Sequence, residues 1–203
     1  MKATLVTTLA VFLPTPGSLI SSSKSAGTST NYASLQEAIN AAVDAAINHN
    51  QYNSRITLLK DTEGTLDLSN IETTRSLRID LEFNRKTFTA TDTIKLDQDI
   101  SLQINNGTIT STDNVNTLVE ISDNHSELSF RNDVTVDATK LKTGGYIANV
   151  TGGRVNLFGK VNSDNATIKI AGGSVQTSNA IKADILLSGS NFSNSSTFRL
   201  DVQ

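Results

Sequence analysis

The sequence predicts a mainly β protein in which short strands stack into a solenoid behind one amphipathic helix. Three observations indicate this fold. From residue 53 onward apolar residues alternate with polar ones, so each short segment buries one face as a strand does. The segments recur about every ten residues and hold few inward apolar residues, which is the width of one face of a coil. Asn, Thr and Gly-Gly pairs lie between them, where stacked turns can form polar ladders.

Residues 1–31 are predicted to form an N-terminal arm and a polar linker. The apolar run of the arm, set among β-branched neighbours, is typical of an extended segment. It provides four assembly candidates, Leu5, Leu9, Val11 and Leu13. Residues 18–31 are small and polar, as in a flexible linker. The alternative is a secretory signal, because Lys2 precedes the run and small residues follow it, with cleavage between Ser21 and Ala26.

Residues 32–52 are predicted to contain a capping helix. Apolar residues fall on one stripe at helical spacing: Leu35, Ala38, Ile39, Ala42, Val43, Ala46 and Ile47. Ser34 and Glu37 have the spacing of a capping box, which satisfies free amides at a helix start. The opposite face carries Asn40, Asp44 and Asn48, which argues against a membrane helix. A helix from Ser34 to about Ile47 should therefore cover one end of the β body.

Residues 53–187 are predicted to form the β body, and residues 188–203 a C-terminal strand and oligomerisation tail. The residues expected to point inward are Leu58, Leu68, Ile79, Leu102, Ile104, Phe130, Val136 and Leu157. Gly-Gly turns precede several strands, at Gly144-Gly145, Gly152-Gly153 and Gly172-Gly173. The tail adds three assembly candidates, Phe192, Phe198 and Leu200.

A β-sandwich is the alternative fold. Asn106-Gly107 is a strong signal for a two-residue hairpin, and folding there would pair Ile104 with Ile109 on one face. The solenoid is preferred because the strands are short enough for one face of a coil.

Several segments resemble a known family. YASLQEAINAA, ITLLKD, SLRIDLEFNRKTFTATDTI and LQINNGTIT are similar to the pectate-lyase-like right-handed β-helix module of bacterial surface proteins and of phage fibres and tailspikes. The resemblance covers roughly residues 32–110 and implies a right-handed parallel β-helix. Glu82 to Arg85 depart from it, because the family has a tighter Asn-Gly turn there. These motifs are structural repeats and say little about function.

Composition excludes several chemistries. The chain has no Cys, so it has no disulfide and no thiolate site. Its two His residues, His49 and His125, are far apart in the sequence and form no local metal-ligand pattern. The net charge of −3 argues against a nucleic-acid partner. We expect no cofactor and no metal.

Acidic residues of the chain are candidates for a lyase or glycosidase site. Such chemistry needs two facing carboxylates or a calcium-binding acid cluster. The candidates are Asp80, Glu82, Asp97, Asp99, Glu120, Asp123 and Asp137. The nearest approaches to a cluster are Asp97-Gln98-Asp99 and Asp123-Asn124-His125, whose residue types are also the commonest in turns. We therefore expect no catalytic residues and no enzymatic activity.

The sequence leads to the expectation of a structural protein of a virion appendage, such as a head or tail fibre. The arm would dock onto virion or cell-surface proteins, and the body would self-associate as a homo-oligomer, in the form of a trimer, and attach to a host surface. The alternative is a secreted or cell-surface bacterial adhesin module that binds glycan. A third reading is an inactive protein similar to a polysaccharide lyase.

Overall fold

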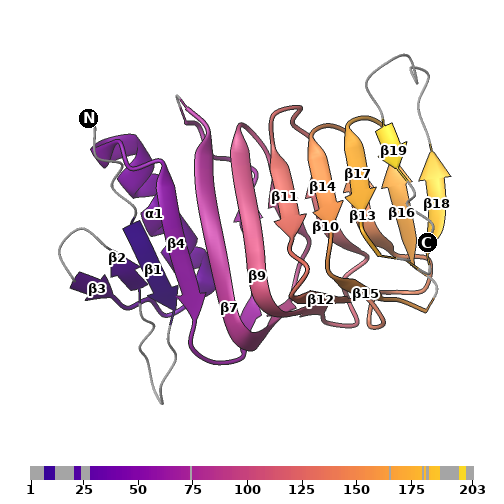
Figure 1. Cartoon of the computed structure of the whole chain (residues 1–203), viewed down its shortest axis with the longest axis horizontal. Helices are drawn as coiled ribbons and strands as arrows, with labels where there is room; N and C mark the ends of the chain where they lie inside the picture. Colours follow the sequence, from indigo (N-terminus) through magenta and orange to yellow (C-terminus); the bar gives the residue numbers. More distant parts are fainter. Residues whose placement is uncertain are drawn as a thin grey trace.

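The computed structural model describes residues 7–11, 21–23, 28–73, 75–164, 166–179, 181, 183–187 and 197–199. The chain is a mainly β parallel solenoid of about five turns with one helix near its N-terminal end (Figure 1). This confirms the predicted solenoid and excludes the β-sandwich.

The solenoid has three faces, which we call the first, second and third face. The first is built from β1 (Thr7–Val11), β4 (Asn53–Leu58), the first halves of β7 (Leu77–Ala90) and β9 (Ile100–Ser111), then β11 (Glu127–Phe130), β14 (Arg154–Leu157), β17 (Ser174–Thr177) and β19 (Thr197–Arg199). The second is built from β5 (Thr62–Gly64), the second halves of β7 and β9, β12 (Val134–Asp137) and β15 (Lys160–Asn162). The third is built from β6 (Asp67–Leu68), β8 (Ile94–Leu96), β10 (Thr117–Ile121), β13 (Tyr146–Val150), β16 (Thr167–Ile170) and β18 (Asp184–Leu187). A separate antiparallel pair joins β2 (Ser21–Ser23) to β3 (Thr28–Thr30).

Parallel registers stack the inward residues into columns. One column of the first face runs through Ile79, Leu102, Leu128, Val155 and Val175. A second runs through Leu81, Ile104, Phe130 and Leu157. Members of both columns are at most 1% exposed. All eight residues predicted to point inward are buried, which confirms the alternation read from the sequence.

The Asn106-Gly107 pair forms a corner of the coil instead of a hairpin. Strand β9 continues through it, and Ile104 and Ile109 face their partners on β7 in the same parallel ladder. Asn106 takes the left-handed conformation (φ 54°), which turns the chain from the first face to the second. A Cβ on Gly107 would lie 2.4 Å from the Cβ of Phe83, so the close stacking of this corner requires glycine.

The corner one coil earlier, at Glu82 to Arg85, is built differently. Asn84 (φ 50°) and Arg85 (φ 62°) are both left-handed, and the register between β7 and β9 shifts there. The longer segment is therefore a wider corner on the same ladder.

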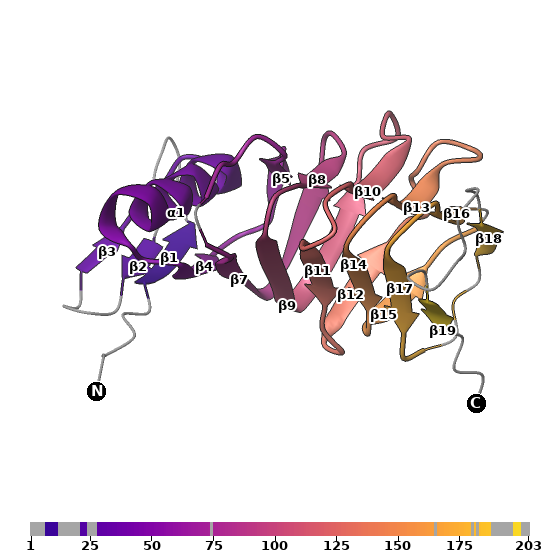
Figure 2. The same ribbon diagram turned by 90° about the horizontal axis from the view of Figure 1, so that it is seen from above.

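Helix α1 spans Leu35–His49, and Ser34 is its N-cap, as predicted. The Ser34 hydroxyl accepts from the Glu37 amide at 3.1 Å, and the Glu37 carboxylate accepts from the Ala33 amide at 2.7 Å. The predicted buried stripe is wrong at Ile47, which lies in the last turn of the helix and is 52% exposed. Figure 2 shows α1 on the same side of the molecule as β8, β10 and β13, so it extends the third face beyond β6.

The N-terminal segment differs from the expected arm where it is described. β1 pairs in parallel with β4, with Leu9 opposite Ile56 and Val11 opposite Leu58. Thr7–Val11 therefore belongs to the first face, because its β-branched residues extend the same ladder as the body. Leu5 and Leu13 lie outside the described residues.

The C-terminal end of the third face leaves its core columns open. Ile185 and Leu187 stand opposite the buried Ile168 and Ile170 in register, yet they are 40% and 50% exposed. In the tail, Phe198 stands opposite Val175 in the pairing of β19 with β17, whereas Phe192 and Leu200 lie outside the described residues.

Candidate functional site

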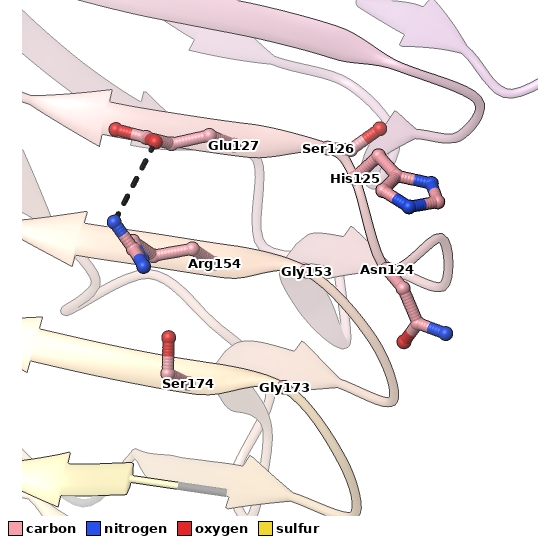
Figure 3. A pocket seen from close by; sticks show the side chains of 8 residues that line it. All are labelled: Asn124, His125, Ser126, Glu127, Gly153, Arg154, Gly173 and Ser174. Carbon is pink, nitrogen blue, oxygen red and sulfur yellow. Dashed lines mark ion pairs between the residues drawn. The ribbon is translucent and has the colours of Figure 1, made fainter. Parts of the chain in front are cut away.

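The corner between the third and the first face carries a shallow groove. At this corner the chain passes from β10 to β11, from β13 to β14 and from β16 to β17. The groove has a volume of about 430 Å³, and Figure 3 shows the residues that line it: Asn124, His125, Ser126, Glu127, Gly153, Arg154, Gly173 and Ser174.

Two stacked glycines allow consecutive turns to pack closely along the groove. Gly153 and Gly173 have positive φ (62° and 64°). A Cβ on Gly153 would lie 2.3 Å from the Ser126 carbonyl oxygen, and one on Gly173 would lie 2.3 Å from the Gly153 carbonyl oxygen. Glycine is therefore required for consecutive turns to approach this closely. The Gly144-Gly145 pair lies at another corner, so the three Gly-Gly pairs are not one repeated element.

Glu127 is held in place by its own strand and by the neighbouring coil. Its Oε1 accepts from the Ser129 hydroxyl at 2.9 Å and from the Asn156 side-chain amide at 2.8 Å. The same amide lies 2.8 Å from the Ser129 oxygen. Ser129 and Asn156 are both buried although they lie on the outer side of the first face. The carboxylate at the edge of the groove is thus fixed in direction.

Arg154 faces Glu127 across one step of the ladder. The register places Glu127, Arg154 and Ser174 in one row at the starts of β11, β14 and β17 (Figure 3). The guanidinium Nη1 lies 3.9 Å from Glu127 Oε2, beyond hydrogen-bond distance. Within the described part of the chain this loose ion pair is the only polar contact of the Arg154 side chain.

Asp99, Asp123 and His125 meet beside the groove. His125 Nδ1 lies 3.8 Å from Asp99 Oδ1 and 3.9 Å from Asp123 Oδ1. Asp123 Oδ2 accepts from the backbone amides of His125 (2.8 Å) and Asp99 (3.2 Å). Burial alone would raise the pKa of Asp123, but these two amides, helped by the nearby His125 and the Ser126 hydroxyl, hold it below its usual value.

This cluster has the donor types of a cation site. Asp99, Asp123 and His125 each offer one ligand atom, and these atoms lie within 4.8 Å of one another. The sequence had indicated the two turns as separate segments, and the stacking of coils brings them together. Asp97 is outside this group.

The other carboxylates considered from the sequence are dispersed. Asp80 and Glu82 lie on the outer side of β7, where they contact Arg78 and Arg55. Glu120, on the third face, accepts from Asn149 at 3.3 Å, and Asp137 accepts from Thr139 at the end of β12. The structure therefore does not bring these four residues to one place.

Sequence reasoning missed the row of Glu127, Arg154 and Ser174. A signal was present, because alignment of Gly152-Gly153-Arg154-Val155 with Gly172-Gly173-Ser174-Val175 places Arg154 over Ser174. Glu127 has no such glycine pair before it, so only the fold reveals its place in the row.

The sequence matches no protein-family model, and no curated protein and no solved structure is detectably similar to it. Within the described residues, no helix has the length and apolar character needed to cross a membrane.

Proposed function

We propose that this chain is a non-enzymatic structural protein of a virion appendage, a head or tail fibre, in which the solenoid is both a spacer and a display surface. The observation that carries the proposal is the difference between the two ends of the third face. At one end the edge strand β6 is hydrogen-bonded to α1, and at the other β18 presents Ile185, Leu186 and Leu187 to solvent.

An open apolar end supports assembly. Apolar residues of a monomeric protein are rarely left exposed as a contiguous group, and such a group commonly marks a contact with another chain. Edge strands also offer free backbone donors and acceptors, which natural proteins tend to cover. Self-association through this end, as a trimer, would bury both.

Docking onto a particle would use the opposite end. Because Thr7–Val11 pairs with β4, this strand would form part of the end that docks onto a virion protein, in place of a separate arm. The first face would then lie along the side of the appendage, where host-surface molecules can reach it.

A second candidate is a bacterial surface module that binds glycan. The observation that favours it is the polar groove of Glu127, Arg154 and Ser174, which is independent of any particle. Both candidates place the chain outside the host or bacterial cytosol when it acts.

Fractionation of the native source tests the proposal. An antibody against the purified chain is applied to density-purified particles, to the cell envelope and to the cytosol. Enrichment in particles, with immunogold label on an appendage, is the expected result. Enrichment in the envelope supports the second candidate, and confinement to the cytosol overturns both.

A further inference from the structure

We propose that the groove at the corner of the coils binds a neutral saccharide, with Glu127 and Arg154 as the pair that recognises its hydroxyl groups. This groove would be the site through which the proposed appendage attaches to a host surface. Only that biological role rests on the proposed function. The binding itself is a property of the isolated chain.

The first step is the preorganisation of Glu127. Its Oε1 is occupied by Ser129 and Asn156, at 2.9 and 2.8 Å, whereas Oε2 is directed to the Arg154 side. A carboxylate held by two neighbours loses little side-chain entropy when a ligand binds to its remaining oxygen. The network therefore prepares one strong acceptor at the groove edge.

The second step is the spacing of the pair. At 3.9 Å, Arg154 Nη1 and Glu127 Oε2 are too far apart for a direct hydrogen bond. A hydroxyl group both donates and accepts, so one sugar hydroxyl can donate to the carboxylate and accept from the guanidinium. Two adjacent hydroxyls can also take one partner each.

The rest of the lining is polar and suits further hydroxyls. Ser174 continues the row on the next strand, and Asn124 and His125 lie on the turn that leads into β11 (Figure 3). The volume of about 430 Å³ lies within the range of roughly 300–1,000 Å³ found for small-molecule sites. Among the described residues the lining carries no aliphatic side chain, which disfavours a lipid or another apolar ligand.

The charge of the site selects a neutral ligand. Asp99, Asp123 and Glu127 place three carboxylates at this corner, against the Arg154 guanidinium and the His125 imidazole. Near neutral pH the carboxylates outnumber the cationic groups, so a uronate, a sialic acid or a phosphate is repelled.

The test combines a glycan array with titration. The purified chain is applied to an array that carries neutral and acidic glycans, and the best neutral glycan is then titrated by calorimetry. Lactose, maltose and glucuronate serve as defined soluble probes. Arg154→Ala and Glu127→Gln should each weaken neutral-glycan binding about tenfold, because each removes a hydrogen bond to a charged group.

The chain contains a matched control pair. Arg55 Nη2 and Glu82 Oε2 are also 3.9 Å apart on the outer side of the first face, and neither lines the groove. Arg55→Ala and Glu82→Gln should leave saccharide binding unchanged. Thermal melts of all four variants identify any that fail to fold. Arg154→Ala is the substitution least expected to disturb folding, because the Arg154 side chain is half-exposed and its one polar contact in the described part of the chain is the loose ion pair with Glu127.

Three outcomes overturn the inference: no neutral glycan is retained on the array, acidic glycans are preferred, or Arg154→Ala binds as well as the original chain. Fractionation and oligomer size do not depend on the groove. Failure of saccharide binding would therefore leave the appendage proposal standing, and failure of fractionation would leave the titration result standing.

Discussion

The side-chain amide of Gln36 pairs with the backbone of Asp67 as a neighbouring strand would. Its Oε1 accepts from the Asp67 amide at 2.8 Å, and its Nε2 donates to the Asp67 carbonyl at 2.9 Å. Asp67 lies on β6, the N-terminal edge strand of the third face. One helical side chain thus closes this sheet edge, where an open edge could pair with another chain.

We expect Gln36→Ala to lower the free energy of unfolding by about 1–2 kcal/mol, since two hydrogen bonds to the backbone are lost. Urea denaturation measures the change. Asn48→Ala is the control, because Asn48 lies on the same helix and its side chain bonds, among the described residues, only to Asp44. Equal losses in the two variants would contradict a closing role for Gln36.

Ile104→Asp should unfold the body. Ile104 is fully buried between Leu81 and Phe130 in the first-face column, so the new carboxylate would be buried without a partner. The cost is several kcal/mol, on the order of the whole stability of many domains. Circular dichroism should show no cooperative melt. Thr108→Asp, on the outer side of the same strand, should retain it, and a cooperative Ile104→Asp melt would contradict the core assignment.

The sequence predicted the inward columns because alternation fixes which residues share a face of a strand. It did not settle the corner at Asn106-Gly107, since the same two residues suit a hairpin and a left-handed corner. The long-range register distinguishes the two structures, because Ile109 pairs with Phe88 on β7 and not with Ile104 across a hairpin. The groove was missed for the same reason: Glu127 and Arg154 lie far apart along the chain, and only the ladder brings them together.

Gly153→Ala should destabilise the protein more than Gly144→Ala. Both glycines have positive φ, so each alanine carries the left-handed penalty of about 1–2 kcal/mol. Only at Gly153 would the Cβ also collide with the carbonyl oxygens of Ser126 and Asp123, whereas Gly144 has open space. We expect about 2–4 kcal/mol for Gly153→Ala from strain and overpacking together. Equal unfolding free energies in urea would show that the turns do not stack closely.

Asp123 should make stability depend on pH. Burial raises the pKa of its carboxyl, but hydrogen bonds from the His125 and Asp99 amides lower this pKa by more than burial raises it. The pKa of Asp123 is therefore lower in the folded than in the unfolded protein. The stabilisation is therefore present above about pH 4 and is lost as the pH falls through the folded pKa. The difference in unfolding free energy between the original chain and Asp123→Asn should narrow on acidification from pH 6 to pH 3. A difference that is constant or grows would contradict the assignment.

The exposed end of the third face should mediate self-association. Ile185 and Leu187 continue the core columns of Ile168 and Ile170, and Leu186 adds a third exposed apolar side chain on β18. Burial of such side chains contributes roughly 1.5–3 kcal/mol each, which favours a contact at micromolar concentration. Light scattering coupled to size exclusion should show the 21.7 kDa chain as an oligomer. Ile185→Lys with Leu187→Lys should convert it to a monomer, because two charges would then lie in the contact.

The control for this prediction is at the opposite end. Ile47 on α1 is 52% exposed, similar to Leu187 at 50%, but it stands apart from the open columns. Ile47→Lys should therefore leave the oligomer intact, which separates a specific contact from general surface hydrophobicity. If the double variant fails to fold, Leu186→Lys is used in its place, because Leu186 stands opposite Lys169, outside the inward columns. A stable monomer of the original chain, or an oligomer that persists in both β18 variants, would exclude assembly through this end.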